Sequence, residues 1–378
     1  MIVASQTFKE HLSSPINEVY AKIELLDKNE NVIDDITTKA IDGSISVSKE
    51  RETRRTFSIS LLNDDNEFTW SVGGRIWLDK RIKLWIGLKI NNQIEFVPQG
   101  IFILTDMAAS SSHTGERIAN LSGLDKWSLL SGDPVGKFTN HTTVEKGVKV
   151  SDAIKTISQG GGIDKFIFDD CDVTVPYTLT YDLGDSRGKA IKELADLAVY
   201  SIFFDVNGYL RFRPQVNLET MPSVWTYDKS DYTLYAKSEK ILDHAELFNK
   251  ILVIGGSSQS GTVSAIAQDD EADSPTSITN IGERLFLYNN GSPDPLITST
   301  VLAQARADFE LKNRLRIAER QPMEIMPNYL HEAEDVITLV DDWHNTNDKY
   351  ELISFNIPLK PSAMMSAEVW RINRIGRR

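Results

Sequence analysis

Apolar and small polar residues alternate along the first third of the chain. In TFSISLL, Phe57, Ile59 and Leu61 fall on one face of an extended strand and two serines fall on the other. RIKLWIGLKI, residues 81–90, has the same period of two. This period is typical of antiparallel strands with one buried face. We therefore expect a first β-barrel domain at residues 1–130.

Residues 131–235 change to the period of a helix. VSDAIKTISQGGG, residues 150–162, has a serine that predicts a helix N-cap at position 151 and glycines where the helix stops. LGDSRGKAIKELADLAVYS, residues 183–201, carries apolar residues at i, i+3 and i+4 after a cap at Asp185 or Ser186. A hairpin with an Asn-Gly tip follows. We expect a small α+β domain here.

The last part of the chain, residues 236–378, returns to strands. Its strand-like segments are KILVIGG, TVSAIAQD, RLFLYNN, DVITLVDD, YELISFNIPLK and AEVWRINRI. One long helix is predicted at residues 299–319, and it stops before Pro322. We expect a second β-barrel domain that carries this helix. The predicted fold class is mainly β, with two β-barrel domains and a small α+β insert.

Composition narrows the function classes. The chain has 378 residues, of which 41% are hydrophobic, enough for two or three packed domains. A formal net charge of −13 argues against a general nucleic-acid binder, which needs a basic face. An acidic wall would instead let DNA pass without sticking. The single cysteine, Cys171, excludes an internal disulfide, and no apolar run approaches the roughly 18 residues of a membrane span.

The motifs that carry catalytic chemistry are incomplete. HEAED, residues 331–335, begins like a zinc-protease motif but has Asp335 where the second histidine is required, so His331 is interpreted as a surface loop residue. IGGSSQSGT, residues 254–262, lacks the lysine of a phosphate loop and leads into a strand. Acidic clusters leave a paired-carboxylate hydrolase open. We expect no enzyme activity, no catalytic residue, no cofactor and no metal.

Two charged segments and two tryptophans are candidates for surface roles. KERETRR, residues 49–55, interleaves glutamates with cations, so we interpret it as a solvated hairpin corner that blocks stray edge pairing, and not as a phosphate site. RINRIGRR is either a solvated end or a basic patch that docks on an acidic neighbour. Trp85 is either sandwiched or exposed for a partner. The candidate interface residues are Trp77, Trp85, Arg371 and Arg374.

The order of these elements resembles that of the tail-hub, or baseplate hub, proteins of tailed phages and related contractile particles. It looks most like the versions in phages and prophages of Gram-positive bacteria, and the same hub fold forms the N-terminal part of many tail-associated lysins. The stretches that carry the resemblance are SISVSKERETRRTFSISLLNDDNEF, IWLDKRIKLWIGLK, FVPQGIFILTD, LSGLDKWSLLSG, SRGKAIKELADLAVYSIFFDVNGYLRFRP, NYLHEAEDVITLV and KYELISFNIPLK.

The resemblance implies two tail-tube-like barrels in each subunit and three subunits in a ring. That homotrimer would join the tail tube to a spike, fibre or lysin, contact the tape-measure protein and enclose a channel that DNA crosses transiently. It would be assembled in the host cytoplasm, reside at the virion tail tip and insert into no membrane. One departure from the family pattern is Glu334-Asp335, where a Gly-Asp turn is common.

Two other functions stay open at this stage. A receptor- or carbohydrate-binding protein of the same particle would depend on exposed tryptophans such as Trp85 or Trp343. A cell-wall hydrolase would depend on carboxylates from the acidic loops.

Overall fold

A computed structural model describes most of the chain, and strands account for 42% of it and helices for 19%. The predicted mainly β fold class is therefore confirmed. Among the described residues, no helix is both long enough and apolar enough to cross a membrane. The described residues are 1–14, 17–113, 115–230, 233–258, 261–317, 319–360 and 363–372.

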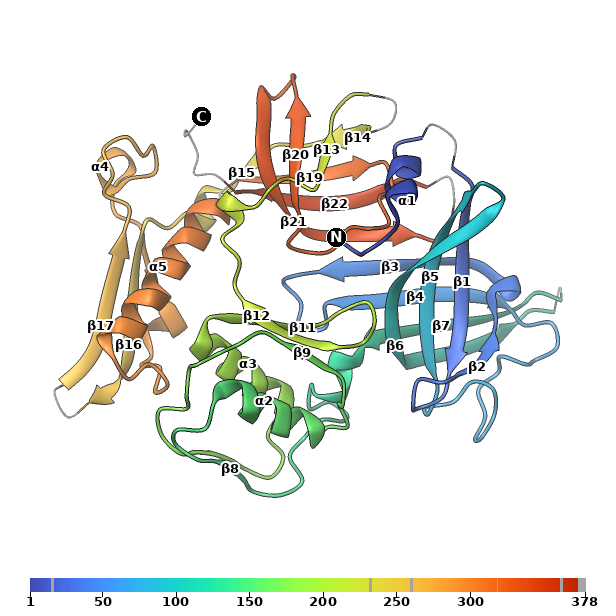
Figure 1. Ribbon diagram of the computed structural model, residues 1–378, viewed down its shortest axis with the longest axis horizontal. Coiled ribbons are helices and arrows are strands. Elements are labelled where there is room, and N and C mark those ends of the chain that lie inside the picture. The colour runs from blue at the N-terminus through green and yellow to red at the C-terminus, as the bar shows by residue number, and fades with distance from the viewer. Residues whose placement is uncertain are drawn as a thin grey trace.

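The N-terminal part contributes seven strands to a large sheet (Figure 1). Their order in the sheet is β3-β4-β7-β6-β5-β1-β2, and every one of these pairings is antiparallel. The strands are β1 (Val19–Leu26), β2 (Val32–Asp35), β3 (Ala40–Ser48), β4 (Arg55–Leu62), β5 (Arg81–Ile90), β6 (Gln93–Ser111) and β7 (Arg117–Asp125).

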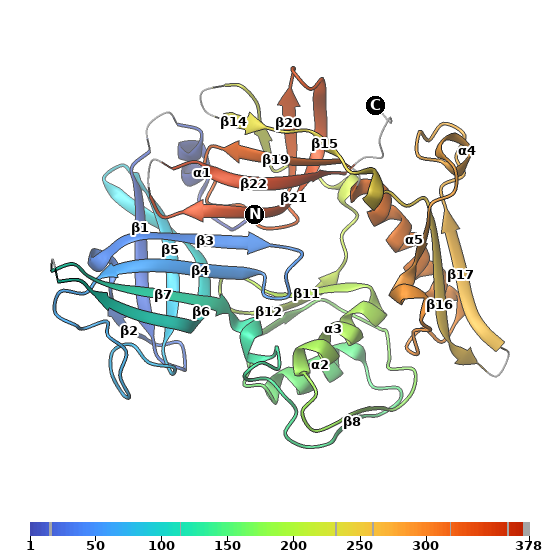
Figure 2. The same cartoon turned by 180° about the vertical axis from the view of Figure 1, so that it is seen from behind.

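The C-terminal part contributes seven more strands to the same sheet, which thus has 14 strands. The two parts are joined by antiparallel pairing of β21 with β3, which lie side by side in Figures 1 and 2. The strands are β13 (Trp225–Tyr227), β14 (Tyr235–Ser238), β15 (Ile241–Leu242), β19 (Glu319–Ile325), β20 (Val336–Asp341), β21 (Thr346–Pro358) and β22 (Met365–Arg371).

One hydrophobic core lies beneath both parts of the sheet. The alternation predicted for β4 is present, since Phe57, Ile59 and Leu61 are buried. Ile45 of β3 lies opposite Ile357 of β21, and both side chains are fully buried. The same cluster of buried side chains extends over the N-terminal and C-terminal strands. The two parts therefore share a packed interior as well as backbone hydrogen bonds.

The small α+β part lies below the sheet in Figure 1 and has its own hydrophobic core. Its second helix is capped by Ser186, whose hydroxyl accepts a hydrogen bond from the Lys189 N–H, as predicted. The first helix begins one residue before Ser151, and its N-cap is Lys149, so the predicted serine cap is wrong. The elements are β8 (Thr142–Val144), α2 (Val150–Gln159), β9 (Phe166–Phe168), β10 (Leu179–Tyr181), α3 (Arg187–Ala198), β11 (Tyr200–Phe204) and β12 (Leu210–Pro214).

The predicted long helix is α5 (Thr300–Ile317), but it does not lie on the main sheet. It packs along a separate sheet of β16 (Lys250–Ser258), β17 (Gly261–Gln268) and β18 (Leu285–Leu287), as Figure 2 shows. Apolar residues of these strands and the helix form a third core. The domain boundaries expected at 130 and 235 stay a prediction; the hydrophobic clusters set residues 247–315 apart from the strands around them.

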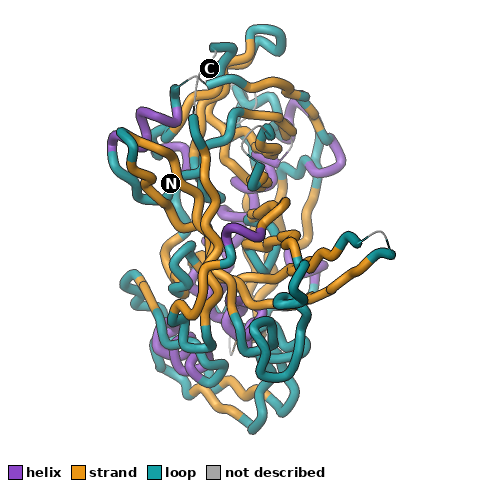
Figure 3. Tube along the Cα trace, turned by 90° about the vertical axis from the view of Figure 1, so that its right-hand side faces the viewer, coloured by secondary structure: helices purple, strands orange, loops and turns teal. Residues whose placement is uncertain are grey.

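Short helices and one long hairpin complete the fold. The β6–β7 hairpin extends beyond the rest of the sheet, and Figure 3 shows it in side view. Its distal half, residues 105–111 of β6, is mostly exposed. The short helices are α1 (Gln6–Leu12), η1 (Thr37–Lys39), η2 (Lys126–Leu129), η3 (Leu218–Thr220), η4 (His244–Glu246), α4 (Ile278–Ile281) and η5 (Tyr288–Gly291).

Replacing Ile45 or Ile357 by alanine is expected to destabilise the whole sheet, because each leaves a cavity in the core shared by both parts. We expect each variant to lose about 2–4 kcal/mol of unfolding free energy. The matched control is Ile41→Ala, since Ile41 lies on the same strand as Ile45 but is 51% exposed. Its effect should stay within about 0.5 kcal/mol. Urea titration followed by circular dichroism measures both, and equal effects of Ile45→Ala and Ile41→Ala would contradict a shared core.

Candidate functional site

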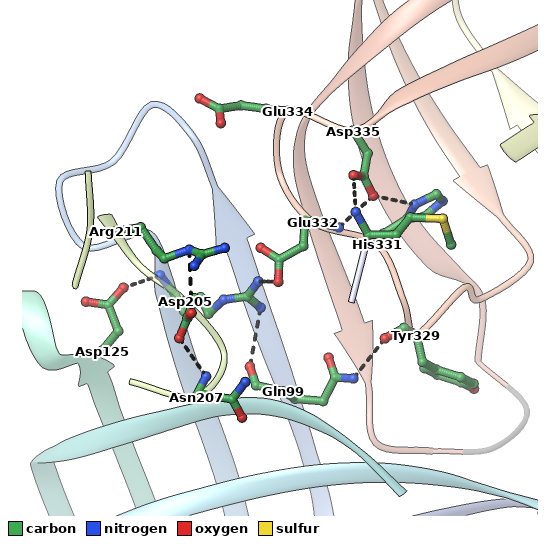
Figure 4. Close-up of polar contacts among 12 residues, drawn as sticks. Gln99, Asp125, Asp205, Asn207, Arg211, Tyr329, His331, Glu332, Glu334 and Asp335 are labelled. Carbon is green, nitrogen blue, oxygen red and sulfur yellow. Dashed lines mark hydrogen bonds and ion pairs between the residues drawn. The ribbon is translucent and has the colours of Figure 1, made fainter. Parts of the chain in front are cut away.

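Three parts of the fold meet at a buried cluster of charges around the loop that precedes β20 (Figure 4). We call it the charge junction and define it by Arg54, Arg55, Arg213, Glu332 and Glu334. Arg55 is the first residue of β4 and Arg54 precedes it, Arg213 comes from β12 of the small α+β part, and the glutamates come from the C-terminal part of the chain. Each pair in the junction therefore joins segments that are distant in the sequence.

Arg55 is the most buried member, with 1% of its surface exposed. Its guanidinium lies 2.7 Å from Glu332 Oε1 and donates to the Gln99 carbonyl oxygen at 3.3 Å. Its backbone N–H donates to the carboxylate of Asp125, and the Gln99 side-chain amide donates to the Tyr329 carbonyl. Burial raises the pKa of Asp125 to about 6, although the backbone N–H groups of Trp127 and Arg55 donate hydrogen bonds to its carboxylate and act in the opposite direction. Figure 4 shows this chain of contacts running from β7 to the loop.

Glu334 bridges two further arginines. Its Oε1 lies 3.3 Å from Arg54 and its Oε2 lies 2.7 Å from Arg213. Both guanidiniums also lie over the ring of the buried Phe203, at 3.8 Å for Arg54 and 5.1 Å for Arg213. The aromatic ring and the carboxylate together surround the two cations with favourable partners. This fixes β11 of the small α+β part against both the start of β4 and the 331–335 loop.

The backbone at position 334 has a conformation that suits glycine better than glutamate. Its φ is +74°, a left-handed conformation that costs non-glycine residues about 1 kcal/mol or more. Glycine adopts this conformation without strain. Burial alone would favour a protonated Glu334, but attraction from Arg54, Lys49 and Arg213 outweighs it and lowers the pKa to about 2. The carboxylate is thus retained at a position where glycine would suit the backbone better.

The sequence analysis predicted that KERETRR is a solvated corner, and this prediction is wrong for Arg54 and Arg55. The segment is structural, as expected, but Arg54 and Arg55 are buried, and Lys49 lies 2.5 Å from the buried Glu351. Glu52 remains at the surface, where it pairs with Lys192 of α3. The cations of this corner therefore hold other parts of the chain in place.

The prediction for His331 is also wrong, because this side chain is fully buried. Its Nε2 lies 2.9 Å from the Tyr227 hydroxyl and its Nδ1 lies 3.3 Å from Asp335 Oδ2. Burial, and then the charge of Asp335, raises the pKa of Tyr227 well above its ordinary value, so the hydroxyl keeps its proton. A buried tyrosine that stays protonated supplies no nucleophile. These contacts order the loop of the charge junction.

A second buried carboxylate links the N-terminal strands to the small α+β part. Glu30 lies 2.7 Å from Lys126, 2.5 Å from Lys165 and 2.6 Å from Arg81. Burial opposes its ionisation, but hydrogen bonds from the two lysines outweigh burial and lower the pKa of Glu30. Its φ is +67°, so it shares the left-handed backbone of Glu334. Both glutamates join separate parts of the fold.

The candidate residue Trp77 belongs to an apolar surface in the loop between β4 and β5. Its ring stacks on that of Trp70 with centroids 6.2 Å apart. Trp70 is 51% exposed; Val72, two residues after it, is 83% exposed, and Leu78, which follows Trp77 in the sequence, is 63% exposed. We call these four residues the loop patch. Exposed apolar groups that gather in this way are typical of interaction surfaces. The sequence analysis missed three of the four, although a tryptophan just before a Gly-Gly turn is a readable signal.

The other candidate interface residues have partners within the chain. Trp85 is half-buried on β5; its indole N–H donates to Glu24 at 2.7 Å and the Lys83 ammonium lies 4.1 Å from its ring centroid. Arg371 is 9% exposed and pairs with Glu319 and Asp348. Arg374 lies outside the described residues. The interface role of these residues stays a prediction. Trp343, named for receptor binding, is 86% exposed.

Two of the cavities among the described residues are lined by several charged side chains each. One, of about 320 Å³, opens beside the charge junction; among its charged lining residues Arg211 pairs with Asp205 and Arg213 with Glu334, whereas Glu332 pairs with Arg55. The other, of about 550 Å³, lies between α3, β10 and the segment before α5. Among the residues that the structure describes, no group of three or more histidine, cysteine, aspartate or glutamate side chains is arranged to hold a metal ion.

Three solved structures share this fold over nearly its whole length. The tail protein from Neisseria meningitidis MC58 has a TM-score of 0.64 and 13% identity, over 93% of this chain and 96% of that chain. The 43 kDa tail protein of prophage MuSo2 from Shewanella oneidensis has a TM-score of 0.61 and 13% identity, over 93% and 98%. The prophage tail protein gp18 from Listeria monocytogenes EGD-e has a TM-score of 0.56 and 12% identity, over 94% and 95%.

No protein-family model and no curated protein matches the chain. At identities of 12–13%, the likeness to the three solved structures establishes the fold. The resemblance to phage tail proteins is therefore confirmed at the level of the fold.

Replacing Glu334 by glutamine is expected to destabilise the protein strongly near neutral pH, because the buried Arg54 and the partly exposed Arg213 lose their shared counter-ion. We expect a loss of about 3 kcal/mol at pH 7. The pKa of Glu334 is lowered from 4.5 to about 2, so its carboxylate contributes fully above pH 4.5 and loses its effect as the pH falls toward 2. Urea titrations of both proteins between pH 2 and 7 measure the difference. Asp125 is present in both, so its own titration largely cancels.

The matched control for this charge effect is Glu50→Gln, an exposed glutamate in the same corner. Its effect should stay within about 0.5 kcal/mol at every pH. A difference between the parent protein and Glu334→Gln that did not shrink below pH 4.5 would rule out the ion pair as its cause.

A comparison of Glu334→Gly with Glu334→Ala isolates the strain of the backbone. Both variants lose the carboxylate, but only glycine fits a φ of +74° without strain. We expect Glu334→Gly to be more stable than Glu334→Ala by about 1 kcal/mol in thermal or urea unfolding. At the neighbouring Ala333, whose φ is not positive, glycine should instead lower stability. Equal stability of the two Glu334 variants would mean that the left-handed backbone carries no cost.

Proposed function

We propose that the chain is a structural protein of a phage tail, and that three copies form a hub ring at the tail tip. The ring would join the tail tube to a spike, fibre or lysin and enclose the channel that DNA crosses. The observation that carries this proposal is the agreement of fold with three tail proteins from one end of the chain to the other. A match of that extent includes the small α+β part as well as the strands.

The internal contacts support a role that needs a rigid body. Rings of identical subunits close only if each subunit holds its two contact surfaces at a constant angle. Here the 14-stranded sheet, its shared core and the charge junction fix three parts of the chain to one another. We infer that this rigidity serves the assembly.

Two exposed features are suited to subunit contacts. The loop patch presents apolar side chains that a neighbouring copy would bury. The β6–β7 hairpin extends beyond its own subunit's sheet, with an exposed distal half (Figure 3). A heterologous contact between different surfaces of successive copies generates a ring when its rotation closes. We assign the loop patch, with Trp77, to such a contact.

The remaining partners follow from the proposed position. A tail tube protein on one face, a tip protein on the other and a tape-measure protein within the channel are the proposed neighbours. The formal net charge of −13 suits a channel through which DNA passes without sticking. We propose no enzyme activity for this chain. That it belongs to the type found in phages and prophages of Gram-positive bacteria stays a prediction.

The proposed ring is tested by the mass and shape of the purified chain. Three copies of the 42.5 kDa chain give about 128 kDa, and light scattering should find that mass, with threefold rings in negative-stain images. Replacing Trp70 and Trp77 by alanine should shift the mass toward the monomer at equal concentration, because the apolar contact is removed. Trp343→Ala, at a more exposed tryptophan outside the loop patch, should leave the mass unchanged.

Other outcomes would count against the ring. A wild-type monomer at every concentration up to about 100 μM would contradict a self-assembling trimer. Binding of the chain to purified cell walls, lost on Trp343→Ala, would favour a receptor-binding protein, since Trp343 is 86% exposed.

A further inference from the structure

The separate sheet beside α5 ends on one side at β17, which lies at the outer edge of the molecule in Figures 1 and 2. Among the strands that the structure describes, β17 pairs with β16 alone. The N–H of Asp269, just after β17, donates to the Asn249 carbonyl, just before β16. Backbone groups alternate in direction along an antiparallel strand. Ser264, Ile266 and Gln268 therefore direct their N–H and C=O groups away from β16.

This outer edge of β17 is accessible to a partner. The side chains of Ser264, Ile266 and Gln268 are all exposed. The side-chain amide of Gln304, on α5, donates to the Ile266 carbonyl at 3.3 Å, and Gln304 is itself exposed. A donor that lies outside the sheet thus reaches the edge. The N–H groups of the three outward residues have no strand to pair with.

β17 lacks the devices that usually protect a free edge from other chains. Short length, charged side chains, proline and bulges are such devices. At the ends of the 14-stranded sheet, β2 has four residues that include Asp34 and Asp35, and β14 carries Lys237 and pairs irregularly. β17 has eight residues without a charge or a proline, and its pairing is regular from Ser264 to Gln268.

Apolar side chains lie beside the edge on the face of the sheet that is turned away from α5. Ile266 lies opposite Leu252 of β16, and Leu252 lies opposite Leu287 of β18. Ile266 is 50% exposed and Leu287 is 41% exposed. Ile251 and Ala267, on the other face, belong to the core that contains α5. An apolar residue on an added strand would extend this row of side chains beside Ile266.

The charges near the edge favour a cationic partner. Residues 263–283 carry five carboxylates and no lysine, arginine or histidine. Asp269 is buried, and Glu283 pairs with Lys250. The exposed acidic residues that follow the Gln268 end of the strand are Asp270, Glu271 and Asp273. Complementary charge would attract a basic segment to this end and disfavour an acidic one.

We propose that the free edge of β17 is a docking site at which an extended segment of a partner protein adds as a further strand. The segment would place an apolar residue beside Ile266 and a lysine or arginine near Asp270. Main-chain hydrogen bonds to Ser264, Ile266 and Gln268 would supply affinity, and the apolar and basic side chains would supply specificity. These residues lie outside the loop patch and the β6–β7 hairpin, so the site does not depend on the proposed ring.

Isothermal titration calorimetry of the full chain tests the site with an acetylated, amidated Lys-Val-Thr-Val-Thr-Val-Lys peptide. A matched peptide with glutamate in place of both lysines should bind about tenfold more weakly or not at all. Hydrogen exchange then locates the contact. Bound peptide should slow exchange at the N–H groups of Ile266 and Gln268, and it should leave Ala265 and Ala267, which face β16, unchanged.

Two variants at the edge separate strand addition from attraction to an acidic surface. Ser264→Pro removes an outward N–H that β16 does not use, so the peptide should bind about tenfold more weakly while the far-UV circular dichroism is unchanged. Ser264→Ala is the matched control and should change the affinity less than about twofold. Ile266→Lys, at a half-exposed position that tolerates a charge, should weaken binding about fivefold, because it replaces the apolar contact with a repelling cation.

The charge of the partner is tested by a pair of double variants. Asp270→Asn with Asp273→Asn should weaken peptide binding about threefold, because two exposed carboxylates near the edge are lost. Asp169→Asn with Asp170→Asn removes two exposed carboxylates of the small α+β part and should have less than about half of that effect.

Each of four outcomes would overturn the proposal. These are no binding of the basic peptide at millimolar concentration, equal affinity of Ser264→Pro and Ser264→Ala, binding without slower exchange at Ile266 and Gln268, and a dimer of the chain that Ser264→Pro dissociates. The last result would assign the edge to a second copy in place of a partner protein.

Discussion

The burial of Arg55 and its neighbours is the constraint on which the arrangement of this protein depends. Taking a guanidinium out of water costs several kcal/mol unless a carboxylate and further acceptors surround it. Arg55 meets this condition only when Glu332 of the C-terminal part and the Gln99 carbonyl of β6 are both in place. The buried Arg54 meets it only when Glu334 lies beside it, and Glu334 also pairs with the partly exposed Arg213. Any relative movement of the three parts would leave a buried charge unpaired, so the junction specifies one arrangement.

The two bridging glutamates show how strongly that constraint acts on the backbone. Glu334 and Glu30 both hold a left-handed φ that glycine adopts without strain. Glu334 pairs with Arg54 and Arg213, and Glu30 pairs with Lys126 and with Lys165 of the small α+β part. Strained residues persist where the surrounding contacts over-determine them. The loss of an attractive ion pair would exceed the backbone strain, and this difference accounts for glutamate at position 334, where glycine would suit the backbone better.

The sequence predicts local structure well here and long-range charge pairing poorly. The alternation of Phe57, Ile59 and Leu61 identifies β4, and the helical period identifies α3, because burial of one face imposes these periods. The hydrophobic period of a helix does not show which sheet the helix packs against. In this structure α5 packs against the separate sheet of β16, β17 and β18. KERETRR was interpreted as a solvated corner because surface charges have the same local pattern as buried ones. The glutamates that pair with its cations lie nearly 300 residues away in the sequence. A local hydrophobic period cannot predict such distant pairs.

The contrast between the interior and the surface bears on assembly. Buried ion pairs add little net stability compared with apolar packing, but they penalise every wrong arrangement. Exposed apolar side chains such as Trp70 and Val72 do the reverse: they add affinity for a partner with little demand on geometry. A subunit that must close a ring needs both properties, in separate places. In the proposed ring, charges would fix the angle between the parts of each subunit before assembly, and apolar contacts would then supply the free energy of association. The placement of the charges inside and of the loop patch outside fits that division.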